Sequence, residues 1–167
     1  MDSQTEKALR RMNELHPEAF PSHEIERFIL GLPADPEFGI LKPRPDGCHL
    51  LLEVDCPPNG NQKLEISLHD SDSIDLLQRG ILQTIRAEWP TIWSEARSAW
   101  FKEYPTDAEV ITNHWDWVLE GKIPSDTTLQ EEFEGDPVWQ LSISSNAAAT
   151  IVNLTMEGST VLDAELL

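Results

Sequence analysis

The stretch RAEWPTIWSEARSAWFKEY, residues 86–104, carries three of the six tryptophans and the only tyrosine of the chain. At 100° per residue, Trp89, Trp93 and Trp100 fall on one stripe of an α-helix. Proline removes a backbone donor inside a helix, so we expect the helix to kink or restart at Pro90. A row of rings on one stripe suits an apolar cover for a sheet better than an exposed binding platform, so we expect these indoles to be buried.

The apolar period that contains this stretch runs from about Ser73 to Tyr104. Ser73 or Asp72 can cap its start, and Asp75 in the first turn suits the positive end of the helix dipole. The sequence therefore predicts one long helix with a break near its middle.

Strand-like patterns lie on both sides of this helix. HLLLEVD and KLEISLHD are separated by a Pro- and Asn-Gly-containing loop, which predicts a hairpin. Leu64 and Ile66 alternate with Glu65 and Ser67, so one face of the hairpin should be buried and the other wet. Three further runs near the C-terminus predict an antiparallel meander: residues 138–144, 149–157 and 159–166. The fold class expected is α+β, an antiparallel sheet of hairpin plus C-terminal meander covered by the long Pro-kinked helix.

The N-terminal part of the chain has a different pattern. Residues 1–32 predict two short amphipathic helices, the first started by a capping box at Ser3 and the second by Ser22. Residues 33–47 are rich in proline and glycine and predict a connector, followed by a single α+β domain over residues 48–167. Residues 105–137 leave a short helix and a strand both open.

Charge is the strongest compositional feature of the chain. Thirty acids against twelve bases give a net charge of −18, and residues 103–167 hold a single base, Lys122. Such a field repels nucleic-acid phosphates and anionic membranes and attracts basic proteins or metal cations. No apolar run approaches the roughly 20 residues of a membrane span, and no signal peptide is recognisable. We therefore expect a soluble cytoplasmic protein that binds neither nucleic acid nor membranes.

The two cysteines, Cys48 and Cys56, flank the first strand-like run. If that run is extended, about 3.3 Å per residue separates them by far more than the roughly 7 Å that a disulfide allows between Cα atoms. Free thiols are then expected, whereas a run that bends back would let the pair close.

Motifs for catalysis and metal binding are weak in this chain. The run from Asp70 resembles a calcium loop superficially but has Ile74, Asp75 and Ile81 where an EF-hand needs an oxygen ligand, a glycine and a glutamate. No G-x-S-x-G elbow, phosphate loop or G-x-G-x-x-G is present. No catalytic residue, metal or cofactor is predicted.

Two His–acid pairs are the basis of an alternative hypothesis, in which the protein is an enzyme. His69 with Asp70, and His114 with Asp116, could each supply metal ligands or acid–base groups of a hydrolase-type site. The alternative to an enzyme is a binding protein, for which the chain offers a different constellation.

That constellation combines aromatic and acidic side chains between residues 114 and 139. Rings provide desolvated contact and cation–π attraction, while carboxylates orient a basic partner. A core role for the tryptophans, including Trp139, stays open beside this reading. The predicted partner-binding residues are Trp115, Asp116, Trp117, Glu120, Asp126, Glu131, Glu132, Glu134 and Asp136.

The run KLEISLHDSDSIDLLQRGILQTI, residues 63–85, and the closing meander resemble small acidic α+β domains of uncharacterised bacterial proteins, some of which are similar to toxin-immunity proteins. The resemblance covers about the last hundred residues and carries over no functional residue. The excess of acids in residues 103–167 and the missing catalytic motifs predict a non-catalytic protein-binding module that docks on a basic partner, as an immunity- or inhibitor-like protein does. A nucleic-acid mimic, with carboxylates at phosphate-like intervals, is a third hypothesis.

Overall fold

The computed structural model describes residues 32–45, 47–69, 73–103, 105, 117–124, 138–145 and 150–166, together with residues 7, 8, 10, 11, 14 and 15. Contacts divide the chain into two units, Met1–Pro43 and Arg44–Leu167. Within the described residues, no helix is long and apolar enough to cross a membrane.

The described part of the first unit contains one small antiparallel ribbon, formed by β1 (Ala34–Asp35) and β2 (Gly39–Ile40). Its turn is closed by the Asp35 carboxylate, whose Oδ1 accepts hydrogen bonds from the Glu37 and Phe38 amides at 2.9 and 3.1 Å. Short strands thus lie within the stretch expected to be a connector. Two N-terminal helices were predicted over residues 1–32, and most of that stretch lies outside the described residues. Only six residues of 1–31 are described, and they are helical.

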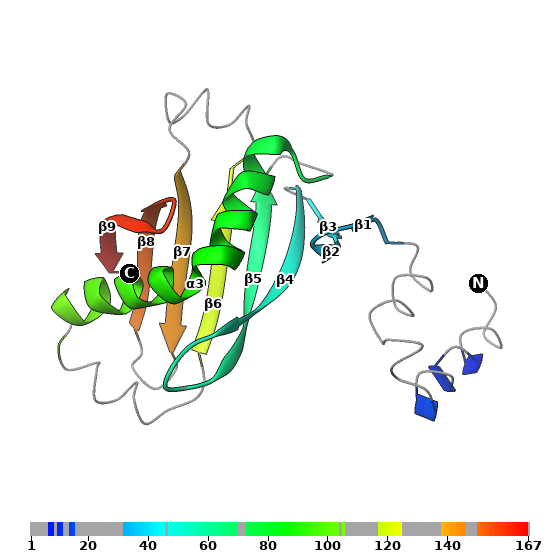
Figure 1. The fold of residues 1–167 in the computed structure, drawn as a ribbon, viewed down its shortest axis with the longest axis horizontal. Helices are drawn as coiled ribbons and strands as arrows, with labels where there is room; N and C mark the ends of the chain where they lie inside the picture. Colours follow the sequence, from blue (N-terminus) through cyan, green and yellow to red (C-terminus); the bar gives the residue numbers. More distant parts are fainter. Residues whose placement is uncertain are drawn as a thin grey trace. The chain divides into compact units, whose positions relative to one another are not determined.

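The larger sheet has seven strands in the order β3-β4-β5-β6-β7-β8-β9, which is also their order along the chain (Figure 1). From β4 to β9, each strand is antiparallel to the next, except that β5 and β6 are parallel. The strands are β3 (Lys42–Arg44), β4 (Gly47–Asp55), β5 (Asn61–His69), β6 (Trp117–Ile123), β7 (Val138–Ser145), β8 (Thr150–Glu157) and β9 (Thr160–Leu166).

The prediction of the fold class is confirmed in its main features, an α+β fold with a mostly antiparallel sheet and one long helix. The hairpin is β4–β5 and the meander is β7–β8–β9. The sheet is larger than predicted because β6 joins the two parts. The stretch that left helix and strand open contains this strand, which pairs with β5 on one side and with β7 on the other. A parallel neighbour requires a crossover, and the helix provides it.

The crossover helix is α3 (Leu76–Glu103), and it contains Pro90 near its middle. Figure 1 shows that the helix changes direction about halfway along, as expected where a proline removes one hydrogen bond of the ladder. The N-cap is Asp75 rather than Ser73 or Asp72. Its Oδ1 accepts the Gln78 amide at 2.7 Å, and the Gln78 Oε1 accepts the Asp75 amide at 3.2 Å. This reciprocal pair is a capping box that starts the helix.

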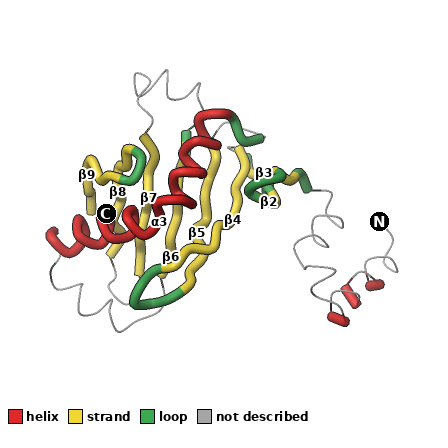
Figure 2. The backbone as a smooth tube through the Cα atoms, in the orientation of Figure 1, coloured by secondary structure: helices red, strands yellow, loops and turns green. Residues whose placement is uncertain are grey.

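The core lies between α3 and one face of the sheet (Figure 2). Trp89, Trp93 and Trp100 are 4 %, 3 % and 0 % exposed, which confirms that the tryptophan stripe is core. Buried indole N–H groups need acceptors, and they are supplied by the tip of the β4–β5 hairpin. The Trp89 Nε1 donates to the Asp55 carbonyl at 2.9 Å, and the Trp93 Nε1 donates to the Pro57 carbonyl at 3.0 Å.

Candidate functional site

The face of the sheet opposite α3 is exposed, and it carries polar and charged side chains together with the exposed apolar side chains of Leu51, Val118 and Ile151. Residues alternate between the two faces along every strand, so each strand contributes every second side chain to this open face. Along β6, Leu119, Gly121 and Ile123 are buried, whereas Glu120 and Lys122 are exposed. The expected wet face of β5, with Glu65 and Ser67, lies on the same side and is confirmed as the less buried one.

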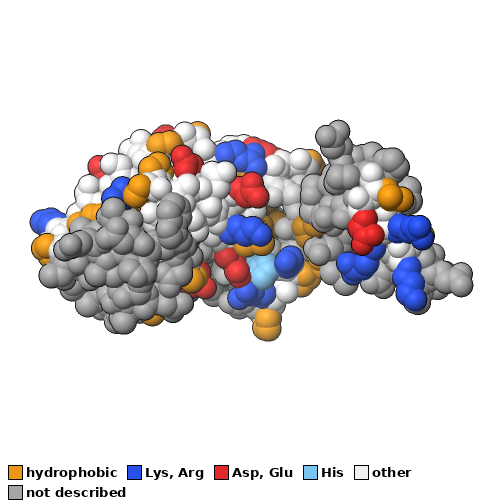
Figure 3. Space-filling view, turned by 90° about the horizontal axis from the view of Figure 1, so that it is seen from below, with side chains coloured by type: hydrophobic (Ala, Val, Ile, Leu, Met, Phe, Trp, Pro, Cys, Tyr) orange, Lys and Arg blue, Asp and Glu red, His pale blue; other side chains and the backbone are white. Residues whose placement is uncertain are grey.

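A hollow of about 270 Å³ lies on this open face over the centre of the sheet. It brings together side chains from four strands that are far apart in sequence, and basic and acidic groups lie side by side in this region of the surface (Figure 3). The lining residues are Arg44, Glu65, Ser67, Glu120, Gly121, Lys122, Gln140 and Ser142.

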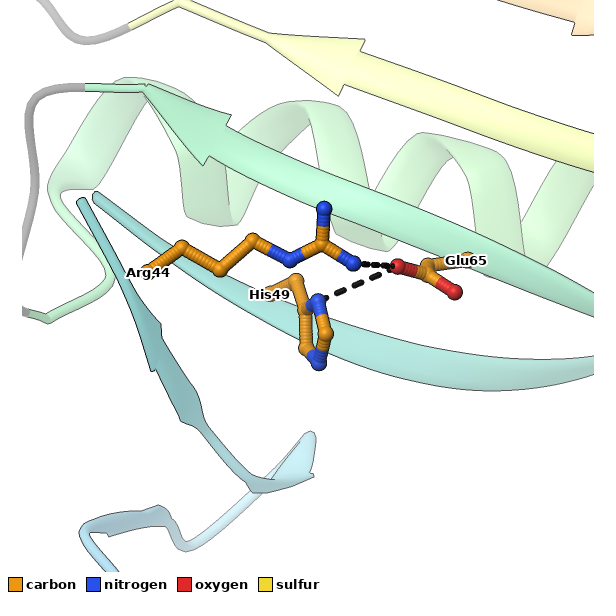
Figure 4. A network of polar contacts seen from close by, with 3 residues as sticks. All are labelled: Arg44, His49 and Glu65. Atoms are coloured by element: carbon orange, nitrogen blue, oxygen red, sulfur yellow. Dashed lines mark hydrogen bonds and ion pairs between the residues drawn. The ribbon is translucent and has the colours of Figure 1, made fainter. Parts of the chain in front are cut away.

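One side of the hollow is held by a small charge network (Figure 4). The Arg44 guanidinium contacts the Glu65 carboxylate through Nη2 and Oε1. The His49 Nδ1 lies 3.1 Å from the same Oε1, a contact that is an ion pair only when the imidazole is protonated. Arg44 and His49 therefore both contact Oε1 of Glu65, and the positive charge of Arg44 neutralises the Glu65 carboxylate.

The centre of the hollow is an in-register pair of carboxylates. Strands β5 and β6 are parallel neighbours, and Glu65 and Glu120 are Cα partners. Neighbouring strands are about 4.8 Å apart, and like charges directly opposite each other are destabilising. Glu65 is neutralised by Arg44, but among the described residues no cation lies within 4.0 Å of the Glu120 carboxylate. Glu120 is thus an exposed acid with which a cation brought by a ligand can form an ion pair.

Acids do not form a continuous line across the described open face. The cross-strand row that contains Glu65 and Glu120 continues through Ser142 and Asn153 before it reaches Glu165. The Ser142 hydroxyl donates to the Asn153 Oδ1 at 2.6 Å, so the middle of the row is neutral. In this row, therefore, the carboxylates of Glu65 and Glu120 are separated from that of Glu165 by two neutral positions.

Of the nine predicted partner-binding residues, only Glu120 has a described side chain, and it lies in the hollow. Trp117 is the first residue of β6, and nothing further is described of it. The other seven lie outside the described residues: Trp115, Asp116, Asp126, Glu131, Glu132, Glu134 and Asp136. Trp139, considered with them, is a core residue that is 1 % exposed and donates from Nε1 to the Gly158 carbonyl at 3.0 Å.

The groups that could bind a metal or act as a thiol nucleophile are histidines, cysteines and acids, some of which lie in the described part of the chain. There, no three His, Cys, Asp or Glu side chains are grouped as a metal site would need. The side chain of His69 and the residues Asp70, His114 and Asp116 fall outside it. Cys48 and Cys56 are free, as predicted, and buried. Burial raises the pKa of the Cys56 thiol to about 12 and the charge of Asp55 adds to this, while a hydrogen bond with Trp89 opposes it. A thiol this poorly ionised is a weak nucleophile.

Sequence reasoning missed most of the hollow. Arg44 fell in the predicted connector, and His49 and Lys122 were not assigned to any site. The alternation in KLEISLHD placed Glu65 on a wet face, but only the parallel pairing of β5 with β6 puts it beside Glu120. Comparison of the chain with protein-family models, with curated proteins and with solved structures found no match.

Proposed function

We propose that this chain is a non-catalytic protein-binding module that holds a basic partner through its open, acidic face, in the manner of an immunity or inhibitor protein. The observation that carries the proposal is the in-register pair Glu65–Glu120, of which only Glu65 is neutralised by a described residue. A guanidinium from a partner would contact Glu120, for which no described residue supplies an ion-pair partner, and charge-assisted bonds of this kind are among the stronger ones.

The distribution of charge supports the same proposal. Residues 103–167 combine 13 acids with one base, and the described strands β6 to β9 show part of that excess. Glu157, Asp163 and Glu165 are exposed, in addition to Glu120. Fields of one sign accelerate the encounter with a partner of the opposite sign and make it sensitive to salt. The partner would therefore present arginine or lysine side chains.

The proposal is tested with a defined basic probe. A short arginine-containing peptide is titrated into the full chain by calorimetry at low and at physiological salt. Glu120→Gln should weaken binding about tenfold, because it removes one charge-assisted contact. Glu53→Gln is the matched control, since it removes the same charge from an exposed position in register with Lys63. Equal losses in both variants would show that only net charge matters and would overturn the role of Glu120.

The partner itself is sought in extracts of the cells that make the protein. We expect the full chain to capture a basic protein that is released at high salt and is no longer captured by Glu120→Lys. The combined reversal of Glu131, Glu132 and Glu134 to lysine tests the predicted acidic segment in the same assay. Capture that neither variant changes would contradict the proposed surface. Stoichiometric metal in the purified protein would favour the hydrolase alternative instead.

A further inference from the structure

A second concave site lies away from the open face of the sheet, between the tip of the β4–β5 hairpin and the second half of α3. It is an open cleft with a volume of about 430 Å³. Its walls are mainly apolar or aromatic, and one arginine and two serine hydroxyls lie among them. The lining residues are Asp55, Pro57, Pro90, Trp93, Ser94, Arg97, Ser98 and Phe101.

Arg97 is held firmly in this cleft. Its Nη1 donates to the Pro57 carbonyl at 3.0 Å, and its guanidinium carbon lies 5.3 Å from the centre of the Phe101 ring and 6.0 Å from that of Trp93. Stacking on aromatic faces is a favourable arrangement for a guanidinium, and it fixes the orientation of the donors. An arginine that is already oriented loses little side-chain freedom when it binds an anion.

The hydrogen-bonding capacity of Arg97 is mostly unused. A guanidinium has five N–H donors, and among the described residues only the Pro57 carbonyl accepts from it. The buried Nε has no hydrogen-bond partner there, and no carboxylate forms an ion pair with this arginine. An oxygen anion is the ligand that matches these donors.

The surroundings of Arg97 select among oxygen anions. The cleft offers a single guanidinium, and the exposed Asp55 on its rim disfavours a doubly charged group such as a phosphate. Pro57, Pro90 and Phe101 offer apolar surface to the rest of a ligand. Hydroxyls of Ser94 and Ser98, on the exposed side of the helix, can donate to the second oxygen of a carboxylate.

We propose that this cleft binds a carboxylate attached to an apolar body, with Arg97 as the group that holds the carboxylate. Two sources share that chemistry, a free organic acid and the C-terminal carboxylate of a peptide chain that ends in an apolar residue. The site is separate from the hollow that contains Glu120, so it does not depend on the function proposed above.

The test follows the Arg97 Nε–H and Trp93 indole N–H signals of the full chain by ¹⁵N NMR during titration with small probes. The first pair of probes is 3-phenylpropionate and its neutral amide. The second pair is N-acetyl-alanyl-phenylalanine with a free or an amidated C-terminus. We expect saturable shifts with a Kd on the order of 1 mM or below for the carboxylates, and at least about tenfold weaker binding for the amides. Tighter binding of the peptide acid would identify a chain end as the ligand, and equal or tighter binding of phenylpropionate would identify a free acid.

Three variants make the result specific. Arg97→Gln should weaken carboxylate binding at least about tenfold. Because Arg97 also anchors the hairpin tip, Ser94→Leu provides a second variant that fills the cleft and leaves the arginine in place. Arg86→Gln removes the same charge from an exposed position of α3 that does not line the cleft, and it should leave binding unchanged. The proposal is overturned if amide and acid bind alike, if phenyl phosphate binds more tightly than phenylpropionate, if no probe gives a saturable shift, or if Ser94→Leu has no effect.

Discussion

The two faces of the sheet are made by alternate residues of the same strands, and they have opposite properties. On β6, Leu119 and Ile123 are 2 % and 0 % exposed, while Glu120 and Lys122 between them are exposed. The buried face packs against three tryptophans of α3. The open face contains a hollow lined by acidic and basic side chains. Folding energy is therefore concentrated on one face, which leaves the side chains of the other free to vary with the needs of a ligand.

This contrast has consequences that can be measured as differences between the faces. Substitutions on the helix side should change the free energy of unfolding, and substitutions on the open side should change ligand binding. A helix-side variant that changes only ligand binding, or an open-face variant that changes only stability, would contradict this contrast.

The largest effect is expected for Trp100→Ala. The Trp100 side chain is 0 % exposed, and its removal should lower the free energy of unfolding by about 3–5 kcal/mol through lost burial and the cavity left behind. Leu51→Ala is the control on the open face, where Leu51 is 45 % exposed, and it should cost less than about 1 kcal/mol. Urea denaturation followed by circular dichroism measures both, and comparable costs would contradict the assignment of the core.

A smaller loss is expected for Gly121→Val, on the buried side of β6. A Cβ added at Gly121 would lie 3.2 Å from the Ile66 Cγ1, which is too close without movement of that side chain. Overpacking of this kind costs roughly 1–3 kcal/mol. Lys122→Val introduces the same side chain one residue later on the open face and should change stability by no more than about 0.5 kcal/mol. If Gly121→Val were as stable as the natural chain, β5 and β6 would not pack as closely as described.

How far the sequence predicts the fold depends on the range of the interactions. The tryptophan stripe follows from helical periodicity, and the β4–β5 hairpin follows from alternation and turn residues, so both were predicted. The N-cap was misassigned because Ser73, Asp72 and Asp75 all have capping side chains, and only the contact between Asp75 and Gln78 decides among them. Local chemistry therefore located these elements to within a few residues.

The candidate site depends on strand pairing, which local patterns do not determine. Glu120 was predicted as a binding residue from the acids around it, but its neighbour Glu65 lies 55 positions earlier and joins it only through the parallel β5–β6 register. Arg97 was not singled out from the sequence, since its importance comes from the Pro57 carbonyl and the Phe101 ring together. Both candidate sites therefore depend on contacts between residues that are distant in the sequence.

An effect confined to alkaline pH is expected at Cys56, a buried thiol at the end of the helix-side face. Its pKa is about 12 in the folded chain against 9.0 for an ordinary thiol, mainly because of burial. Between these two values the folded state retains a proton that the unfolded chain loses, so stability should fall as the pH rises above 9. Cys56→Ala should show a shallower decline between pH 9 and 10.5 in urea denaturation.

Alkylation provides an independent measurement of the burial of the Cys56 thiol. In a Cys48→Ala background, iodoacetamide should modify the native thiol of Cys56 at pH 8 far more slowly than the unfolded one, because little thiolate is present and access is closed. Rapid modification of the native protein would contradict both the burial and the raised pKa.

The smallest effect on stability is expected for the Arg44–Glu65 pair on the open face. Both side chains are well exposed, at 44 % and 36 %, and exposed ion pairs contribute about 0–1 kcal/mol because water and salt screen them. A double-mutant cycle with Arg44→Ala and Glu65→Ala measures this coupling, and it should shrink further at high salt. A coupling above about 2 kcal/mol would mean that the hollow is shielded from water, and the open face would then contribute to folding as the covered face does. A value near zero would instead leave Glu65 and Glu120 available to a basic ligand, because Arg44 could exchange for an incoming guanidinium at little cost.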